Sequence, residues 1–345
     1  MAQSPGRPGL RLQWSNVGMQ SRAWMCTELS PDLSGLHCVE RVLRPPAPGQ
    51  VRVRAAALTF PDLLMTQGKY QHKPPLPFVA GMECAGEVEA VSADVQGFAF
   101  GERVCYGGHG GAFAEALLAP AHMLRPLPKG LDFAQGAAYG VTALTAWVAL
   151  VRRAALQPGE TLLVHGASGG TGLAAVQLGR FLGATVIATG SSSAKLEAAR
   201  AAGAHHLLVV EDGARGLAAA VKDLTDGAGA DVIFDPVGGD LFDASVHCTA
   251  WGGRLLVVGF ASGRIGTLPS NLPLIKGFAV IGVRAGEYGR RDPERGAQNR
   301  RAVEALAAQG VFTPLIGARF AFDQALEAFR AMVERRVAGK IVLEM

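Results

Sequence analysis

The feature that most constrains the fold is a glycine-rich segment between a short apolar strand and a helix. Thr161–Val164 predicts the strand, and Gly172–Leu182 has the spacing of an amphipathic helix. Between them stands His165-Gly166-Ala167-Ser168-Gly169-Gly170-Thr171-Gly172. Gly169 would let the backbone approach a pyrophosphate, and the helix N-terminus offers N–H donors and partial positive charge. The segment therefore predicts a dinucleotide-binding loop, and a tight turn without a ligand is the alternative.

Around this loop, short apolar strands alternate with helical segments. Alternation at this spacing predicts βαβ units and a doubly wound parallel sheet, which is an α/β fold. The further strands are expected at Thr185–Ala188, His206–Val210, Val232–Phe234 and Arg254–Val258, and the helices at Ala134–Leu150, Ser193–Ala202, Leu217–Thr225 and Leu241–Cys248.

The end of the second strand distinguishes NAD from NADP. An NAD site usually has an acidic residue there, which bonds the ribose 2′-hydroxyl. This chain has Thr189-Gly190-Ser191-Ser192-Ser193-Ala194-Lys195, and the first acid is Glu197. Hydroxyl groups and one cation suit a 2′-phosphate, so the segment favours NADPH. One of the serines can instead cap the next helix.

The regions on either side of this α/β core have different patterns. The N-terminal third is β-rich, with strands expected at Gln50–Leu58, Cys84–Val91 and Ala112–Ala119. The C-terminal tail predicts two helices and a final strand, which can return to the first domain because chain ends are often close in space. These tail elements are expected at Gln298–Ala308, Phe322–Glu334 and Lys340–Leu343.

Composition and charge exclude several classes of protein. The chain is 49% hydrophobic and 18% charged, which is too apolar for a disordered protein. Its net charge is +4, but Arg7, Arg11 and Arg22 all precede the first acidic residue, Glu28. The nearly neutral remainder predicts no extended nucleic-acid-binding face. No uninterrupted apolar run reaches the roughly 18 residues of a membrane span.

The N-terminal segment and the cysteines bear on the compartment. The first 22 residues contain arginine and no acid, which fits a mitochondrial presequence and equally a frayed terminus. The expected location is therefore mitochondrial or cytoplasmic. The five cysteines form no CxxC pair, so free thiols are expected.

The residues from about Arg22 to Leu343 resemble the zinc-free quinone oxidoreductase branch of the medium-chain dehydrogenase/reductase superfamily, which includes zeta-crystallin. Collinear motifs over nearly the whole chain carry this resemblance, in addition to the glycine loop. They are Phe60-Pro61-Asp62-Leu63-Leu64, Gly68-Lys69-Tyr70, Gly81-Met82-Glu83, Gly101-Glu102-Arg103-Val104, Thr145-Ala146, Gln157-Pro158-Gly159-Glu160, Asp235-Pro236-Val237-Gly238-Gly239, Val257-Val258-Gly259-Phe260 and Gly339-Lys340-Ile341-Val342.

The resemblance implies a GroES-like β-rich catalytic domain that clasps a Rossmann domain, with the cofactor between them. Residues 1–22 would be a flexible or presequence-like segment, 23–145 the GroES-like domain completed by 285–345, and 146–284 the Rossmann NADP-binding domain. It also implies a homodimer. The residues that would bind the cofactor are Thr145, Ser168, Gly169, Gly170, Thr171, Gly172, Gly190, Ser191, Lys195, Gly238, Gly259, Phe260, Ala261, Ile281, Gly282, Val283 and Lys340.

Three departures from the family pattern matter. Zinc-dependent relatives have Gly-His-Glu where this chain has Met82 in the middle position, and a thioether is a poor zinc ligand beside imidazole. No four-cysteine structural lobe is present either, so no metal is expected. Thr59 and Leu64 replace an Asn and an aromatic residue that border the substrate pocket in many relatives. Val210 stands where an aromatic or His residue is often near the adenosine.

The expected reaction is zinc-independent hydride transfer from NADPH to a quinone or an electron-poor alkene. Negative charge then develops on an acceptor oxygen, and a hydrogen-bond donor near it would help. Tyr70 is the candidate donor and Thr59 a smaller second one, although Tyr70 could equally be an aromatic that packs at the mouth of the site. The alternatives are an enone or enoyl-thioester reductase and a non-catalytic NADPH-binding protein, because the fold alone does not separate them.

Overall fold

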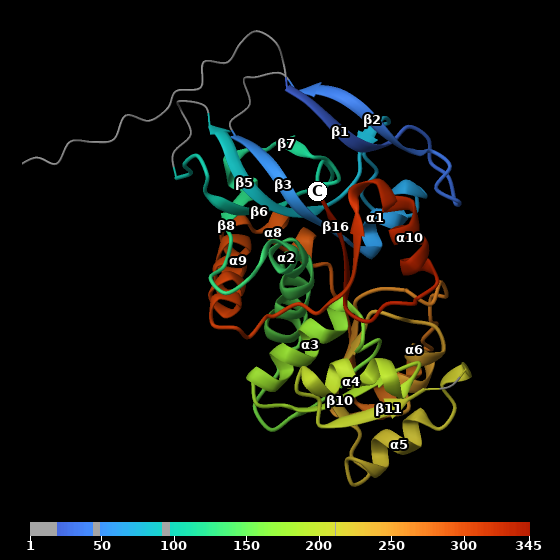
Figure 1. The fold of residues 1–345 in the computed structure, drawn as a ribbon. Helices are drawn as coiled ribbons and strands as arrows, with labels where there is room; N and C mark the ends of the chain where they lie inside the picture. Colours follow the sequence, from blue (N-terminus) through green and yellow to red (C-terminus); the bar gives the residue numbers. More distant parts are fainter. Residues whose placement is uncertain (1–18, 44–48, 92–96, 211) are drawn as a thin grey trace, which may run out of the picture.

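The computed structural model describes residues 19–43, 49–91, 97–210 and 212–345 (Figure 1). The prediction of a flexible or presequence-like segment falls mostly on residues 1–18, outside the described part. Within the described part, two large sheets dominate, one of six strands and one of seven. A third sheet has three strands.

The six-stranded sheet is parallel throughout and has the order β11-β10-β9-β12-β13-β14. Its strand order reverses between β9 and β12, which is the position where doubly wound sheets bind nucleotides. The predicted Rossmann arrangement is therefore confirmed. The strands are β9 (Thr161–Val164), β10 (Thr185–Gly190), β11 (His206–Val209), β12 (Ala230–Asp235), β13 (Thr249–Val257) and β14 (Ala279–Gly282).

Helices connect these strands because each strand is apolar on both faces and needs cover on both. Leu163, Ile187, Ile233 and Leu255 are completely buried in this sheet. The connecting helices are α3 (Gly170–Phe181), α4 (Ser193–Ala201), α5 (Leu217–Asp223), α6 (Asp240–Ser245) and α7 (Asn271–Lys276). A single 3-10 turn, η3 (Asp212–Ala214), precedes α5.

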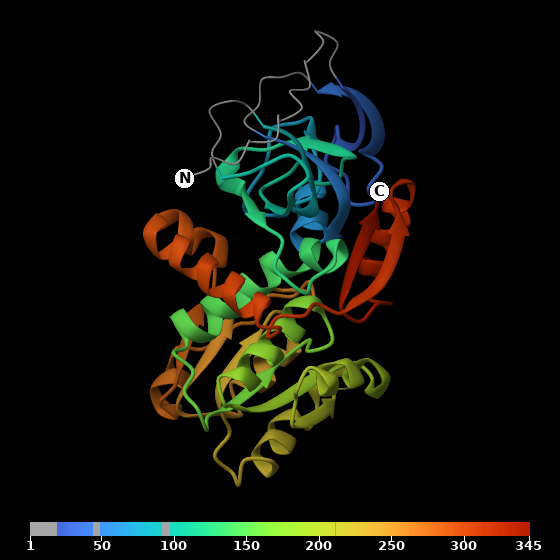
Figure 2. The same cartoon turned by 60° about the vertical axis from the view of Figure 1, so that its left-hand side comes forward.

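The seven-stranded sheet joins strands of the N-terminal β-rich region to the last two strands of the chain. Its order is β15-β16-β3-β5-β6-β8, with β7 on β3, and the last strand of the chain pairs antiparallel with β3 (Figure 2). The predicted return of the terminal strand is confirmed. The strands are β3 (Gly49–Leu58), β5 (Glu83–Val91), β6 (Arg103–Gly107), β7 (Ala116–Leu118), β8 (Leu124–Pro126), β15 (Ile316–Ala321) and β16 (Lys340–Glu344).

One predicted strand is much shorter than expected. Instead of Ala112–Ala119, only Ala116–Leu118 joins the sheet as β7. The preceding residues bond other segments: Phe113 exchanges backbone hydrogen bonds with Ala80 and Trp24. The Phe113 side chain is fully buried, so its apolar pattern reflects core packing rather than strand pairing. The small sheet beside it contains β1 (Met19–Cys26), β2 (Leu36–Leu43) and β4 (Phe78–Val79).

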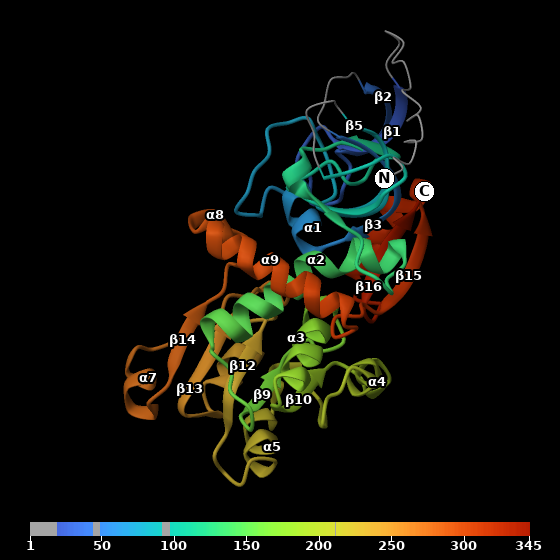
Figure 3. The same ribbon diagram turned by 90° about the vertical axis from the view of Figure 1, so that its left-hand side faces the viewer.

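Helix α2 (Phe133–Trp147) lies between the two large sheets and contacts β3, β5 and α3 (Figure 3). A π-helical turn, η2 (Val148–Arg153), extends it. Together they are long and apolar enough to cross a membrane, with a mean hydropathy of 1.3, but 61% of that window is buried within the protein. Burial between two sheets explains the apolar composition, since a central helix must be hydrophobic on nearly every side.

The remaining helices complete the packing around these sheets. Helix α1 (Phe60–Thr66) follows β3, and α10 (Ala325–Val333) packs on β16 after the 3-10 turn η4 (Phe322–Gln324). Another 3-10 turn, η1 (Ala121–Met123), precedes β8. Helices α8 (Ala285–Arg291) and α9 (Pro293–Ala308) follow β14, and α9 packs on α2.

Candidate active site

The glycine loop stands between β9 and α3 as predicted. A Cβ on Gly172 would lie 2.3 Å from the Gly166 carbonyl oxygen, so only glycine lets α3 pack this closely. Gly169 differs, because a Cβ there would meet only that same oxygen at 3.5 Å. Ser168 and Gly169 bind the start of the last strand: the Gly339 N–H donates to the Ser168 carbonyl at 2.7 Å. The loop is thus held by the C-terminal strand and leaves space for a ligand above Gly169.

Two loops at the carboxyl ends of β12 and β13 brace each other beside the glycine loop. Asp235 is buried, and one of its carboxylate oxygens accepts the N–H groups of Val237 and Gly238, both at 2.8 Å. The Ala261 N–H donates to the Pro236 carbonyl at 3.1 Å. A Cβ on Gly259 would lie 3.1 Å from that Pro236 oxygen. Phe260, at the tip, is 38% exposed.

The predicted nicotinamide side continues onto the next strand and onto α2. Ile281 and Gly282 belong to β14, and Val283 donates its N–H to the Val257 carbonyl at 2.9 Å. These residues therefore lie at the carboxyl ends of the strands, next to the loops that follow β12 and β13. The Thr145 hydroxyl donates to the Val141 carbonyl at 2.7 Å within α2. Thr171 lies in the first turn of α3.

The predicted 2′-phosphate end contacts the C-terminal segment in a way that sequence reasoning missed. Gly190 ends β10, Ser191 is exposed, and Ser192 caps α4 by accepting the Lys195 N–H. The Lys195 ammonium donates to the Arg335 carbonyl. The Arg335 guanidinium in turn donates to the Ala261 carbonyl at 2.8 Å.

Lys195 and Arg335 are separated by 140 residues, so their spacing along the chain could not link them. The available signal was the arginine pair just ahead of the final strand. The contact joins the Arg335 backbone to Lys195 at the end of β10, while the Arg335 guanidinium points to the Ala261 carbonyl.

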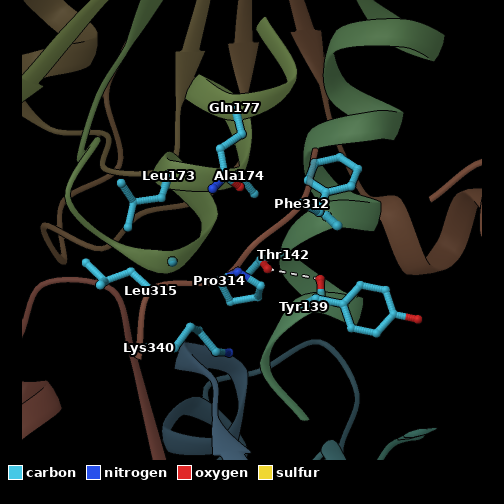
Figure 4. A pocket seen from close by; sticks show the side chains of 11 residues that line it. Tyr139, Thr142, Leu173, Ala174, Gln177, Phe312, Pro314, Leu315 and Lys340 are labelled. Carbon is cyan, nitrogen blue, oxygen red and sulfur yellow. Dashed lines mark hydrogen bonds between the residues drawn. The ribbon is translucent and has the colours of Figure 1, made fainter. Parts of the chain in front are cut away.

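Lys340 lies at the meeting point of the two large sheets. It is 6% exposed, and its ammonium stands 3.5 Å from the Glu83 carboxylate, which also accepts the Val141 N–H at 2.5 Å. Its stem passes the glycine loop, because a Cβ on Gly170 would lie 2.6 Å from the Lys340 Cδ. Figure 4 shows Lys340 at one end of a small pocket between α2, α3 and the 312–315 segment. Of the residues predicted to bind the cofactor, only Gly170 and Lys340 line that pocket.

Thr59 and Asp62 form a closed pair at the start of α1. The Thr59 hydroxyl donates to Asp62 Oδ2 at 2.6 Å, and the Thr59 N–H donates to the same oxygen at 2.8 Å. Thr59 is thus the N-cap of α1, and Asp62 is the N3 residue that completes its capping box. The Thr59 hydroxyl proton is used in the bond to Asp62. Thr59 could donate to the oxygen of a hydride acceptor only if that bond broke. Met82 contacts the same hydroxyl, with its sulfur 3.8 Å away.

The Thr59–Asp62 pair belongs to a buried charged cluster. Asp62, Glu83 and Lys340 are 1%, 3% and 6% exposed. Asp62 Oδ1 has no hydrogen-bond partner within the described structure. Burial raises the pKa of Asp62 to about 7, against the opposing effects of the Thr59 bonds and the Lys340 charge. Burial also raises the pKa of Glu83, and Lys340 counteracts this.

Tyr70 follows α1 and lies between this buried cluster and a group of arginines. Burial raises the pKa of its phenol, the nearby Arg284 and Arg290 charges oppose the shift, and Asp62 adds to it. The phenol hydrogen bonds to no partner among the described residues. Its proton therefore remains available for an external acceptor, and its role as a donor stays a prediction.

The absence of zinc stays a prediction, and it rests on the chemistry of the side chains in this region. Thr59 and Met82 stand together, and neither is a preferred zinc ligand. Within residues 19–43, 49–91, 97–210 and 212–345, no three His, Cys, Asp or Glu side chains are grouped so that they could hold a metal ion. Cys84 and Cys105 are free and buried in neighbouring strands, as predicted.

Comparison with known protein families matches two models. Residues 47–129 match the alcohol dehydrogenase GroES-like domain, and residues 170–314 match the zinc-binding dehydrogenase model. Among curated proteins, quinone oxidoreductase-like protein 2 of Mus musculus is 36% identical over 338 residues, covering 97% of this chain and 95% of the mouse protein. The Pseudomonas aeruginosa quinone oxidoreductase is 36% identical over 302 residues, with coverage of 86% and 92%.

Solved structures agree with this assignment. A mycobacterial protein solved in complex with NADPH has a TM-score of 0.85 at 29% identity, covering 94% of this chain and 100% of that one. The Pseudomonas syringae quinone oxidoreductase has a TM-score of 0.83 at 31% identity, with coverage of 95% and 100%. The chain therefore belongs to the quinone oxidoreductase branch of the medium-chain dehydrogenase/reductase superfamily, and it is an oxidoreductase that binds a nicotinamide cofactor.

Proposed function

We propose that this protein transfers hydride from NADPH to a quinone or an electron-poor alkene without zinc. The observation that carries the proposal is a nucleotide-binding loop combined with an acceptor site whose side chains are poor zinc ligands. The loop around Gly169 leaves room for a pyrophosphate. On the acceptor side, Thr59 and Met82 stand beside Asp62. NADPH supplies the hydride when bound, and the protein positions it and the acceptor.

The choice of NADPH rests on charge at the end of β10. Lys195 is a cation, and the described end of β10 contains no acidic residue before Glu197. A 2′-phosphate placed near Ser191 could accept a hydrogen bond from the Lys195 ammonium, which an unmodified ribose could not match. The pyrophosphate would lie on Ser168–Gly172 at the N-terminus of α3, a helix of 12 residues.

The acceptor would lie beside Tyr70. When hydride reaches an acceptor carbon, negative charge develops on the conjugated oxygen, and the Tyr70 phenol can donate a hydrogen bond to it. The ordinary pKa of a phenol, 10, keeps that group protonated at neutral pH, and burial raises the pKa further. Thr59 supports this arrangement by fixing the start of α1 through Asp62, rather than by donating to the acceptor.

A homodimer is also proposed, on the basis of family membership and of one exposed edge. Strand β14 ends the six-stranded sheet, and large apolar side chains near it are exposed: Trp251 at 80%, Leu274 at 81% and Ile275 at 67%. An unpaired strand edge with such neighbours favours association with a second copy. Light scattering after size-exclusion chromatography tests this. A monomer at micromolar concentration would contradict it.

The function is tested with a panel of acceptors and NADPH oxidation as the readout. We expect turnover with a simple ortho-quinone such as 9,10-phenanthrenequinone. Enones are included in the panel as alternative acceptors of the same hydride. Binding of NADPH in calorimetry without turnover of any quinone or enone would instead indicate a non-catalytic NADPH-binding protein.

A further inference from the structure

Three segments that are far apart in the sequence meet next to Tyr70. They are the loop after α1, the glycine-rich loop between β6 and β7, and helix α8. The His72 and His109 rings stack with their centroids 4.4 Å apart and their planes tilted by 32°. Arg290 Nη1 stands 2.5 Å from His109 Nε2. Figure 3 shows α8 on the same side of the molecule as α1.

The contacts at His109 fix its protonation. A guanidinium can only donate, so His109 Nε2 accepts and the ring proton lies on Nδ1. Burial lowers the pKa of His109, and the charges of His72 and Arg290 lower it further. His109 is therefore neutral near pH 7. His109 is half-buried and holds Arg290 in place.

The arginines of this region carry more charge than their partners neutralise. Arg284, Arg290 and Arg291 all pair with Glu287, at 3.9, 2.8 and 3.0 Å. Among the described residues, Glu287 is the only carboxylate within ion-pair distance of these three side chains. One negative charge therefore faces three positive ones, and the excess is positive.

This excess charge lies beside the proposed acceptor site. Tyr70 is two residues from His72, whose ring stacks on His109, and His109 contacts Arg290. The charges of Arg284 and Arg290 both act to lower the pKa of Tyr70. Arg284 also follows directly after Ile281–Val283, the stretch assigned to the nicotinamide side. Their side chains are 55% and 44% exposed, so they can reach a ligand without leaving a buried contact.

We propose that Arg284 and Arg290 bind a negatively charged group on the hydride acceptor, so that the preferred substrates are anionic quinones or anionic electron-poor alkenes. A carboxylate, sulfonate or phosphate suits this site because the planar guanidinium group pairs with such oxygens through two parallel hydrogen bonds. The proposal rests on the proposed function, since it concerns the acceptor of that same reaction.

The test compares two acceptors that differ in one charge, 9,10-phenanthrenequinone and its 2-sulfonate. The quantity is the ratio of kcat/KM for the sulfonate to kcat/KM for the parent quinone. The double variant R284Q/R290Q should lower this ratio about tenfold, which corresponds to about 1.4 kcal/mol. Because the ratio is compared between proteins, differences in the intrinsic reactivity of the two quinones cancel.

The matched control is R291Q. It removes the same charge from the same helix, but the Arg291 side chain is 80% exposed and does not act on Tyr70. We expect it to leave the ratio within about twofold of wild type, a difference of about 0.4 kcal/mol. An unchanged ratio in R284Q/R290Q would overturn the proposal, and so would an equal loss in R291Q, because the effect would then be a general field of the helix.

Failure of this inference is distinguishable from failure of the proposed function. Reduction of both quinones with the same ratio in wild type and R284Q/R290Q contradicts only the anion site. If neither quinone is reduced, calorimetry with phenanthrene-2-sulfonate, which accepts no hydride, decides the anion site on its own. Binding by wild type that weakens about tenfold, or about 1.4 kcal/mol, in R284Q/R290Q supports it. No binding by wild type overturns it.

Discussion

The cofactor side and the acceptor side of this protein are built in different ways. At the glycine loop, backbone atoms define the site: Gly172 packs on the Gly166 carbonyl, and Ser168 bonds Gly339. On the acceptor side, side chains from separate segments define it, with Asp62, Glu83 and Lys340 buried beneath Thr59 and Tyr70. Backbone requirements restrict the sequence locally, whereas a side-chain cluster depends on the tertiary fold.

The largest expected effect on cofactor binding separates two roles of glycine within the loop. Replacing Gly172 with Ala puts a Cβ 2.3 Å from a backbone oxygen, so the helix must shift. We expect a loss of about 1–3 kcal/mol in unfolding free energy, and NADPH binding weakened about hundredfold, or about 2.7 kcal/mol. Chemical denaturation and calorimetry measure the two quantities.

Gly169→Ala is the matched control for this pair. Its Cβ would meet only one protein atom, at 3.5 Å, so stability should stay near that of wild type. NADPH affinity should still fall, because the methyl group would occupy the space assigned to the pyrophosphate. Unchanged NADPH affinity in Gly169→Ala would place the phosphates elsewhere.

On the acceptor side, Tyr70→Phe should lower turnover about tenfold, or about 1.4 kcal/mol in the barrier. The phenol ring remains, so only the O–H is lost, and NADPH affinity should not change. Steady-state kinetics with several quinones and enones checks this. If Tyr70→Phe runs at the wild-type rate while Tyr70→Ala is impaired, Tyr70 is a packing residue.

At the adenosine end, Lys195→Ala should raise the NADPH dissociation constant about tenfold, or about 1.4 kcal/mol, and leave NADH almost unaffected. Lys195 also holds the Arg335 carbonyl, so part of the loss would come from a less ordered Arg335. Lys222→Ala, on α5, is the control. Equal affinity of the wild type for NADPH and NADH would be evidence against a 2′-phosphate site here.

The last expected effect concerns stability alone and is a dependence on pH. The pKa of Asp62 is about 7 in the folded protein against 3.8 as its ordinary value, so the folded state holds more protons between these values. Stability from this group is complete below about pH 4, falls as the pH rises, and is lost by about pH 7. The cause is burial, with Glu83 adding to it and Lys340 and Thr59 opposing it.

Asp62→Asn keeps a side-chain oxygen for the Thr59 bonds and removes the titrating proton. We expect it to abolish a fall in unfolding free energy of about 4 kcal/mol between pH 4 and 7. Asp132→Asn, at the exposed cap of α2, is the matched control and should keep that fall. A wild-type profile in which stability rises steadily from pH 4 to 7, unchanged in Asp62→Asn, would contradict the buried cluster.

Sequence patterns predicted the βαβ core well because its determinants are local. The strand at Thr161–Val164 has the predicted bounds, and the helix of the glycine loop begins within two residues of its expected start. Strand β14 was missed because it has only four residues and they are largely exposed. Helix α8 was missed for a related reason, because its charged residues have no apolar period.

The candidate site was predictable at the glycine loop, from glycine spacing, and at the 2′-phosphate end, from a missing acid. Its tertiary contacts could not be predicted. Nothing in the local sequence indicates that Thr59 would use its hydroxyl on Asp62, or that Arg335 would lie against Lys195. The contact of His109 with Arg290 spans 181 positions in the chain, so it depends on how α8 returns to the β-rich half.

The most direct test of metal-free NADPH chemistry is the rate of NADPH oxidation with 9,10-phenanthrenequinone, on untagged protein whose zinc content is measured in the same sample after dialysis against a chelator. We predict turnover with NADPH that exceeds turnover with NADH, at a zinc content far below one ion per chain. Activity that disappears with the zinc and returns in proportion to added zinc would contradict it.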